Sequence, residues 1–199
     1  ETEARGAIEA IRSATDGRVP IIAKETGAGI SREDARALID AGVKIIDVGG
    51  LGGTSWSGVE AYRAEERGDG ESTTMGRLFW DWGVRTPVSV VECAALGAEV
   101  ISSGGVRSGI DMAKSIALGA SLAGAALPFL APATKGPLQV AEALRIYERA
   151  FRTTMFLTAS KNIMDLRSAP VIVLGRTREV LEQRGFDTRK FSIYREMSK

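Results

Sequence analysis

A glycine-rich segment with one arginine is the strongest sign of chemistry in this sequence. It reads Ser102-Ser-Gly-Gly-Val-Arg-Ser-Gly-Ile-Asp111 and begins at the end of an apolar run typical of a buried strand. Gly104 and Gly105 let a ligand approach the backbone, and Arg107 adds positive charge and hydrogen-bond donors. The helix expected from about Ser108 would offer its first N–H groups to an anion. The segment therefore predicts a phosphate site.

The next strand end has a shape that suits the same ligand. There the sequence reads Ala123-Gly-Ala-Ala-Leu127, so small side chains leave room beside the predicted phosphate. Two adjacent strand ends of this kind are difficult to explain as turns alone.

A second glycine-rich turn follows the apolar run Val43–Val48, which contains Asp47. Its residues are Gly49, Gly50, Leu51, Gly52, Gly53 and Thr54. Because glycine lacks a Cβ, the turn predicts an opening for a flat or anionic group, with Thr54 as a hydroxyl donor to a phosphate or ring carbonyl. A flexible connection between a strand and a helix is the alternative. Trp56 fits stacking on a flat ligand and core packing equally well.

Lys24 is the third candidate, at the end of another apolar run and before Thr26-Gly-Ala-Gly29. A lysine at this position could place positive charge beside an anionic ring or an enolate-like species. The alternative is a solvated lysine at a strand end. Glu25 is the neighbouring carboxylate that could pair with it.

These residues need a parallel sheet to bring them together. The apolar runs that predict its strands are Val19–Ala23, Val43–Val48, Glu99–Ser103 and Leu122–Leu127. Helical patterns lie between them, which predicts βαβ units, because parallel strands need crossover connections. In (β/α) barrels the functional face is built from the loops after the strands.

Helix start and stop signals support this arrangement. Ser31 and Ser108 each precede an acidic residue by three positions, as in a capping box, and Gly42 and Gly119 end the two helices. The other predicted helices are 4–14, 57–67, 86–96, 138–160 and 176–184. In the first of these Ile8 and Ile11 would point inward, Thr86 would be the N-cap of the third, and the helix 138–160 would cover the sheet. The long helix carries an apolar stripe of Val140, Leu144, Tyr147, Phe151 and Met155.

Loops are expected at 69–74, which is polar and rich in turn residues, and around Pro128, Pro132 and Pro137. The aromatic cluster within Met75–Trp82 is typical of packing more than of ligand contact.

Composition limits the possible functions. The chain has 199 residues with 26 basic and 25 acidic side chains, so we expect a single domain over residues 1–199 and no nucleic-acid partner. Apolar stretches of about 18 residues and signal-peptide features are absent, so we expect a cytoplasmic protein without a membrane partner. The chain lacks histidine, which excludes histidine triads and His-ligated zinc sites within it. Its one cysteine, Cys93, fits a buried apolar position.

The beginning of the chain is also informative. It has no initiator Met and starts inside a helical pattern, so we expect a processed product or a piece of a longer chain.

Taken together, these motifs resemble the type 2 isopentenyl-diphosphate isomerases. The matching segments are Lys24-Glu-Thr-Gly, Asp47-Val-Gly-Gly-Leu-Gly-Gly-Thr-Ser-Trp56, Asp81-Trp-Gly83, Ser103–Asp111 with Ala117-Leu-Gly-Ala120, and Gly124-Ala-Ala-Leu-Pro128. The resemblance covers nearly the whole chain in order and spacing. It implies an α/β fold of the (β/α)8 TIM-barrel type. It also implies an enzyme that binds FMN and interconverts isopentenyl and dimethylallyl diphosphate, with Mg²⁺ and a reductant such as NADPH.

The resemblance also implies roles for individual residues. Lys24 and Thr54 would contact FMN, with Lys24 as an electrostatic partner of the flavin ring. Gly105, Val106 and Arg107 would hold the FMN phosphate, and Ala126 and Leu127 would close its pocket. Reduced flavin would itself be the acid-base group, so no catalytic side chain is assigned. A homo-oligomer is expected, with a small isoprenoid diphosphate as substrate.

Two departures from the family matter. Gly49 stands where many members have serine, and the family's diphosphate- and magnesium-binding segment, with its Gln-Pro-Glu motif and a histidine, is absent. The chain would then carry about the last four βα units plus the C-terminal helices, with two exposed sheet edges and no metal ligand. Two alternatives stay open: another FMN-dependent oxidoreductase, such as a 2-hydroxy-acid oxidase, and a non-catalytic half-barrel that binds flavin or phosphate. The missing histidine base argues against the oxidase.

Overall fold

The computed structural model describes residues 2–193, and a small parallel sheet lies at its centre. The strands are β1 (Ile22–Lys24), β2 (Ile45–Asp47), β3 (Glu99–Ser102) and β4 (Leu122–Ala123). They pair in the order β1-β2-β3-β4, and every pairing is parallel. The sequence placed all these strands, although it began the first too early: Val19 lies outside β1 and is exposed.

Helices connect and surround the strands. Their bounds are α1 Thr2–Ala14, α2 Arg32–Asp40, α3 Trp56–Glu66, α4 Gly70–Leu78, α5 Thr86–Ala94, α6 Gly109–Ala117, α7 Leu127–Ala133, α8 Pro137–Leu157, α9 Ile163–Ser168 and α10 Gly175–Gln183, with a short 3-10 helix η1 at Thr188–Phe191. Helix α2 connects β1 to β2, the α3–α5 segment connects β2 to β3, and α6 connects β3 to β4. This is the βαβ series that the sequence predicted.

The main core lies between the sheet and the helices that cross over it. Ile46 and Val100 of the sheet are fully buried, as are Ala35 of α2 and Val90 and Cys93 of α5. Burial raises the pKa of the Cys93 thiol to about 12, which agrees with an apolar role for this residue. The sheet is open at both edges within the described residues, since β1 and β4 each pair on one side only.

Two helix caps form as the sequence predicted. The Ser31 hydroxyl accepts a hydrogen bond from the Asp34 N–H, and the Ser108 hydroxyl accepts one from the Asp111 N–H. These caps fix the start of α2 after β1 and the start of α6 after β3. The second cap stands directly beside the predicted phosphate site.

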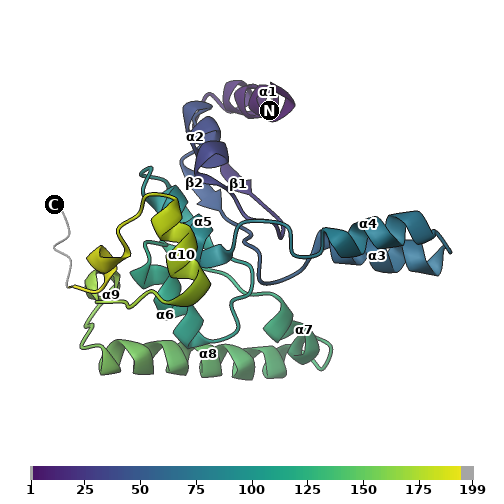
Figure 1. Cartoon of the computed structure of the whole chain (residues 1–199). Helices are drawn as coiled ribbons and strands as arrows, with labels where there is room; N and C mark the ends of the chain where they lie inside the picture. The colour runs from purple at the N-terminus through teal and green to yellow at the C-terminus, as the bar shows by residue number, and fades with distance from the viewer. Residues whose placement is uncertain (1, 194–199) are drawn as a thin grey trace.

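The expected loop at 69–74 is wrong, because this segment forms most of α4. Asp69 is its N-cap and accepts a hydrogen bond from the Ser72 N–H. Helices α3 and α4 make a hairpin that projects from the body of the molecule (Figure 1). They pack closely at Gly76, where an added Cβ would lie 2.6 Å from the Ser57 carbonyl oxygen. Packing of this kind stabilises a helix whose residues favour it only weakly.

The aromatic residues that follow form pairs around the hairpin. Trp80 packs edge-on against Tyr62 of α3 and Phe79 against Trp82, each with ring centroids 5.7 Å apart. Packing was the predicted role, yet these rings lie on the surface, since 73% of Trp82 is exposed.

Other predictions were wrong in detail. The proline-rich stretch after β4 is not all loop, because it contains α7. Helix α5 includes Thr86, and its N-cap is Arg85, without a side-chain hydrogen bond. Ile8 of α1 is buried, but Ile11 is exposed. Helix α8 lies along α6 and α7 and is not a simple cover for the sheet (Figure 1).

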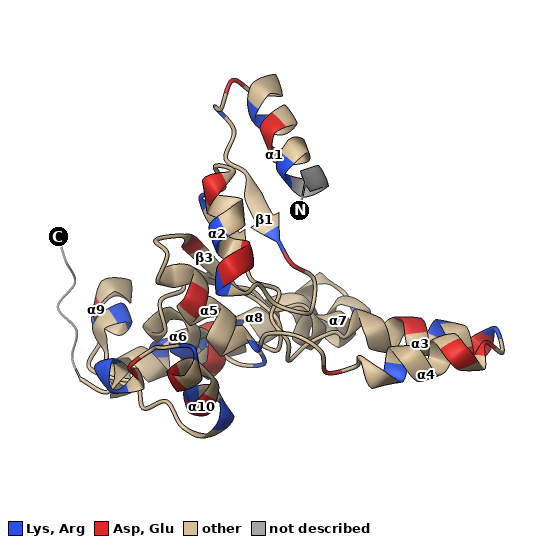
Figure 2. Cartoon of the chain, turned by 45° about the horizontal axis from the view of Figure 1, so that its top comes forward, with Lys and Arg blue, Asp and Glu red and all other residues tan. Residues whose placement is uncertain are grey.

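Residues of both charge signs lie on the same elements. Basic and acidic residues alternate along α1, along the α3–α4 hairpin and around α10 (Figure 2). Within residues 2–193, none of the helices combines the length and apolar character needed to span a membrane.

Candidate functional site

A cavity of about 460 Å³ opens at the carboxyl ends of the strands. Its walls come from the loops after β1, β2, β3 and β4, which are far apart in sequence. All the predicted site residues line it: Lys24, Thr54, Gly105, Val106, Arg107, Ala126 and Leu127. The volume lies within the range of about 300–1,000 Å³ that is usual for ligand pockets.

Lys24 and Asp47 form an ion pair at the floor of this cavity. The β1–β2 register places the two residues opposite each other, and Lys24 Nζ lies 2.6 Å from Asp47 Oδ2. The other carboxylate oxygen accepts hydrogen bonds from the Ser103 hydroxyl and, at 3.3 Å, from the Gly49 N–H. Asp47 thus connects three of the loops that line the cavity. Lysine has three N–H donors, so Lys24 can hold Asp47 and still donate to a ligand.

Glu25 does not pair with Lys24, contrary to the sequence-based suggestion. Its Oε2 accepts hydrogen bonds from the N–H groups of Gly27, Ala28 and Gly29, at 2.6, 2.6 and 3.0 Å. The carboxylate therefore fixes the turn after β1. The signal for this role was present in the acidic residue just before Thr26-Gly-Ala-Gly29, since such a turn presents successive N–H groups to one anion.

The glycines of the turn after β2 serve two different purposes. Gly49 and Gly50 are buried against neighbouring loops. An added Cβ would lie 2.0 Å from the Glu25 carbonyl oxygen at Gly49 and 2.4 Å from the Thr86 Cα at Gly50. Gly49 also has φ +46°, which disfavours other residues. Loop packing therefore demands glycine at these positions, and Gly49 and Gly53 also line the cavity.

Thr54 and Trp56 stand at the rim of the cavity. The Trp56 indole N–H donates to the Thr26 carbonyl oxygen at 3.0 Å, which ties the base of the hairpin to the turn after β1. About half of Trp56 is exposed, so it is not a core residue, and it lines the cavity beside Thr54. Both side chains are available to a ligand.

The predicted phosphate site has free backbone donors. Gly104 and Gly105 adopt φ +94° and +78°, and an added Cβ at Gly104 would lie 2.0 Å from the Gly50 carbonyl oxygen. In the part of the chain that the structure describes, the N–H groups of Gly105 and Val106 donate to no protein acceptor. The Arg107 side chain is exposed and forms no ion pair with the described residues. These groups can bind an anion.

The backbone N–H of Arg107 donates within its own turn. Its N–H donates to Asp111 Oδ2 at 3.1 Å, and the Ser108 hydroxyl donates to the same oxygen at 3.0 Å. Asp111 thus fixes the turn that leads into α6. The groups that remain available to an anion in this segment are the Gly105 and Val106 N–H groups and the Arg107 guanidinium.

The strand end after β4 forms the opposite wall. The Gly124 N–H donates to the Ser102 carbonyl oxygen at 2.8 Å, so this segment stays beside β3. Ala125, Ala126 and Leu127 follow along the cavity, and Leu127 is the first residue of α7. Small side chains keep this wall open.

Metal binding finds little support in the described residues. Among the side chains of residues 5–193 there is no group of three or more His, Cys, Asp or Glu that could hold a metal ion.

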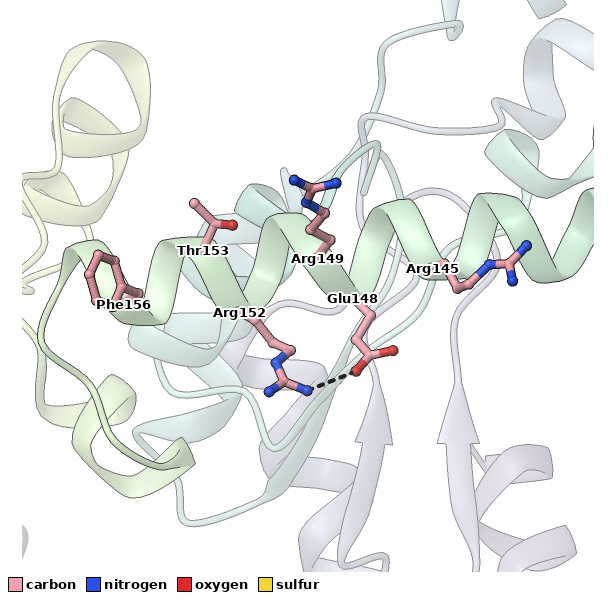
Figure 3. Close-up of a pocket in the computed structure, with 6 residues that line it drawn as sticks. All are labelled: Arg145, Glu148, Arg149, Arg152, Thr153 and Phe156. Atoms are coloured by element: carbon pink, nitrogen blue, oxygen red, sulfur yellow. Dashed lines mark hydrogen bonds and ion pairs between the residues drawn. The ribbon is translucent and has the colours of Figure 1, made fainter.

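A hollow of about 400 Å³ on the outside of α8 is not a comparable site. Arg145, Glu148, Arg149, Arg152 and others lie along one face of this helix (Figure 3). The Arg152–Glu148 pair, at 3.3 Å, joins two exposed side chains. One helix surface without convergent groups provides no enclosed binding site.

Comparison with known proteins identifies the family. The model for FMN-dependent dehydrogenases matches residues 3–173. The chain belongs to the FMN-dependent dehydrogenase family. Residues 3–173 include every residue that lines the cavity, so the site lies inside the part of the chain that the family model matches.

Within this family, the chain is similar to proteins named isopentenyl-diphosphate delta-isomerase. It is 60% identical to the one from Methanothrix thermoacetophila over 195 residues, which cover 98% of this chain and 54% of that protein. Identity to the Methanosarcina acetivorans protein is 53%, over 88% of this chain and 48% of that protein. The chain therefore spans about half the length of these relatives.

Solved structures agree on the fold. A lactate oxidase from Pediococcus acidilactici superimposes with a TM-score of 0.64 at 22% identity, covering 86% of this chain and 41% of that one. A mandelate oxidase gives 0.57 at 26% identity, covering 82% and 40%. With the parallel sheet and its crossover helices, these similarities confirm an α/β fold that forms part of a TIM barrel.

Proposed function

We propose that this chain binds FMN in the cavity at the strand ends and thereby contributes the flavin site of an isopentenyl-diphosphate isomerase. The observation that carries the proposal is the convergence of Lys24, Thr54, the 105–107 segment and the 126–127 segment around one cavity. Family membership and 60% identity to a named isomerase support the same cofactor and reaction.

The residues present suit each part of FMN. The free N–H groups of Gly105 and Val106 and the Arg107 guanidinium would hold the phosphate. Ala126 and Leu127 would close that end of the cavity. The flavin ring would lie toward Lys24 and Thr54, where the glycine backbone permits close approach.

Bound FMN in its reduced form would supply the acid-base group that shifts the double bond of the substrate. The chain's own part is to position that ring and to stabilise negative charge on it. Lys24 is suited to this because Asp47 fixes its ammonium group while leaving donors free. No side chain of this protein is assigned a proton-transfer role.

The substrate diphosphate would bind together with Mg²⁺, and the side chains of residues 5–193 include no group of three or more His, Cys, Asp or Glu that could hold that ion. We propose that they bind to the part of the relatives that this chain does not cover, and that NADPH reduces the flavin. Cytoplasmic location, a homo-oligomeric assembly and the lack of nucleic-acid or membrane partners stay predictions.

Flavin titration tests the cofactor proposal. Arg107→Ala and Thr54→Ala should raise the Kd for FMN while leaving the urea midpoint nearly unchanged. Loss of a charge-assisted hydrogen bond predicts a change of roughly tenfold or more for Arg107. Arg145→Ala, on the outer face of α8, is the matched control and should change nothing. An Arg107→Ala Kd equal to that of the unaltered chain would contradict the phosphate assignment.

Conversion of isopentenyl diphosphate tests the reaction. The chain is mixed with FMN, Mg²⁺ and NADPH, alone and together with the remaining portion of the Methanothrix thermoacetophila relative. We expect dimethylallyl diphosphate only from the combination. A combination that binds FMN but converts no substrate would reject the isomerase proposal and leave the flavin proposal intact. Oxidation of a 2-hydroxy acid by that combination would favour the oxidase alternative, which the fold similarity to mandelate oxidase makes worth measuring.

A further inference from the structure

Tyr147 of α8 lies where the helices behind the phosphate site meet. Its ring packs on Phe129 of α7, with centroids 4.9 Å apart. Its backbone faces the first turn of α6, since a Cβ added at Gly109 would lie 2.2 Å from the Tyr147 carbonyl oxygen. Helices α6 and α7 begin at the two walls of the predicted phosphate site. Tyr147 therefore contacts both elements that position this end of the cavity.

The hydroxyl of Tyr147 is buried and has no hydrogen-bond partner. Among the side chains of residues 5–193 it is the one buried nitrogen or oxygen in this condition. Such groups are rare in native proteins, because an unsatisfied buried donor costs free energy. A donor without a partner in the protein is a candidate to bind a ligand or an ordered water.

Charged residues at the start of α6 also act on this hydroxyl. Burial raises the pKa of Tyr147, the negative charge of Asp111 raises it further, and the positive charge of Arg107 lowers it. Arg107 belongs to the turn that leads into α6, and Asp111 lies in the first turn of that helix. The phenol thus stays protonated at neutral pH and remains a donor.

We propose that Tyr147 is a further phosphate-positioning residue, whose hydroxyl donates to the FMN phosphate directly or through one ordered water. The inference rests on the proposed function of the cavity. It adds a residue from α8, outside the loops after the strands, to the groups that recognise the phosphate.

The test compares FMN with riboflavin, which has the same ring system but no phosphate. Tyr147→Phe removes only the hydroxyl, and should weaken FMN binding about tenfold while leaving the riboflavin Kd unchanged. Urea unfolding without ligand should show equal or greater stability, since the change removes an unsatisfied buried group. Tyr62→Phe is the matched control, because Tyr62 is exposed on the α3–α4 hairpin; it should alter neither Kd.

The outcomes separate this inference from the proposed function. If the unaltered chain binds FMN no better than riboflavin, the phosphate site itself is wrong and the inference falls with it. If the unaltered chain prefers FMN and Tyr147→Phe keeps the same ratio of the two Kd values, the role of Tyr147 alone is rejected. A selective loss of FMN affinity supports it, because weakened packing would affect both flavins equally.

Discussion

Gly50 offers a sharp test of how the site is built, because its replacement should disturb packing without backbone strain. A Cβ added there would lie 2.3 Å from Thr86 Oγ1 and 2.4 Å from the Thr86 Cα. Carbon atoms normally approach to about 3.5 Å, so Gly50→Ala demands a displacement of roughly 1 Å. The backbone atom cannot rotate away, as the end of a long side chain could.

The cost can be worked from the groups that must move. Thr86 Oγ1 donates to the Gly104 carbonyl oxygen at 2.6 Å, so its displacement would strain a hydrogen bond that joins α5 to the phosphate loop. Overpacking costs about 1–3 kcal/mol and a lost buried hydrogen bond about 1 kcal/mol more. Gly50→Ala should therefore lower the free energy of unfolding by about 2–4 kcal/mol. For a chain of this size, the melting temperature would fall by roughly 5–15 °C.

Gly124→Ala is the matched control for this substitution. Gly124 lines the cavity, and an added Cβ there would meet only the Ser103 Cβ at 3.7 Å, an ordinary contact. Its free energy of unfolding should change by less than about 1 kcal/mol. Urea and thermal denaturation followed by circular dichroism measure both variants. A Gly50→Ala midpoint equal to that of the unaltered chain, or an equal fall for Gly124→Ala, would refute the packing explanation.

Three further predictions concern stability and reactivity. Glu92→Ala should lower the free energy of unfolding in urea by about 2–3 kcal/mol, because the buried Glu92 carboxylate pairs with the partly exposed Arg184 at 2.6 Å. Glu33→Ala removes an exposed partner of Arg184 and should lower it much less. Equal losses would contradict this explanation. Cys93, with its pKa raised to about 12 by burial, should react with a thiol reagent at pH 8 only in urea, and rapid labelling of the folded chain would show that it is accessible. Hydrogen bonds from Ser72 lower the pKa of Asp69, so this carboxylate should stabilise the fold above its ordinary pKa and lose that contribution as the pH falls through the lower folded pKa. Asp69→Asn should therefore flatten the acid limb of the curve of stability against pH. An unchanged limb would count against the cap.

Sequence patterns located the strand ends and hence the site. Buried apolar runs, the caps at Ser31 and Ser108 and the glycines after them are local signals, and the structure reproduces them. The seven predicted site residues line one cavity because parallel strands all end on the same face. Their individual roles in binding stay predictions.

Features that depend on contacts between distant segments were beyond those patterns. Helix α4 forms because Gly76 packs against α3, although its polar start resembles a loop. Lys24 pairs with Asp47 of the neighbouring strand and not with Glu25, the residue next to it in sequence. The orphan hydroxyl of Tyr147 could be found only once α8 was placed against α6 and α7.

The most direct test of the central claim is a crystal structure of the chain with FMN bound. The account predicts the phosphate within hydrogen-bond distance of the Gly105 and Val106 N–H groups and the Arg107 guanidinium. It predicts the flavin ring between Lys24 and Thr54. A phosphate bound elsewhere, or a flavin ring on another face of the molecule, would contradict it.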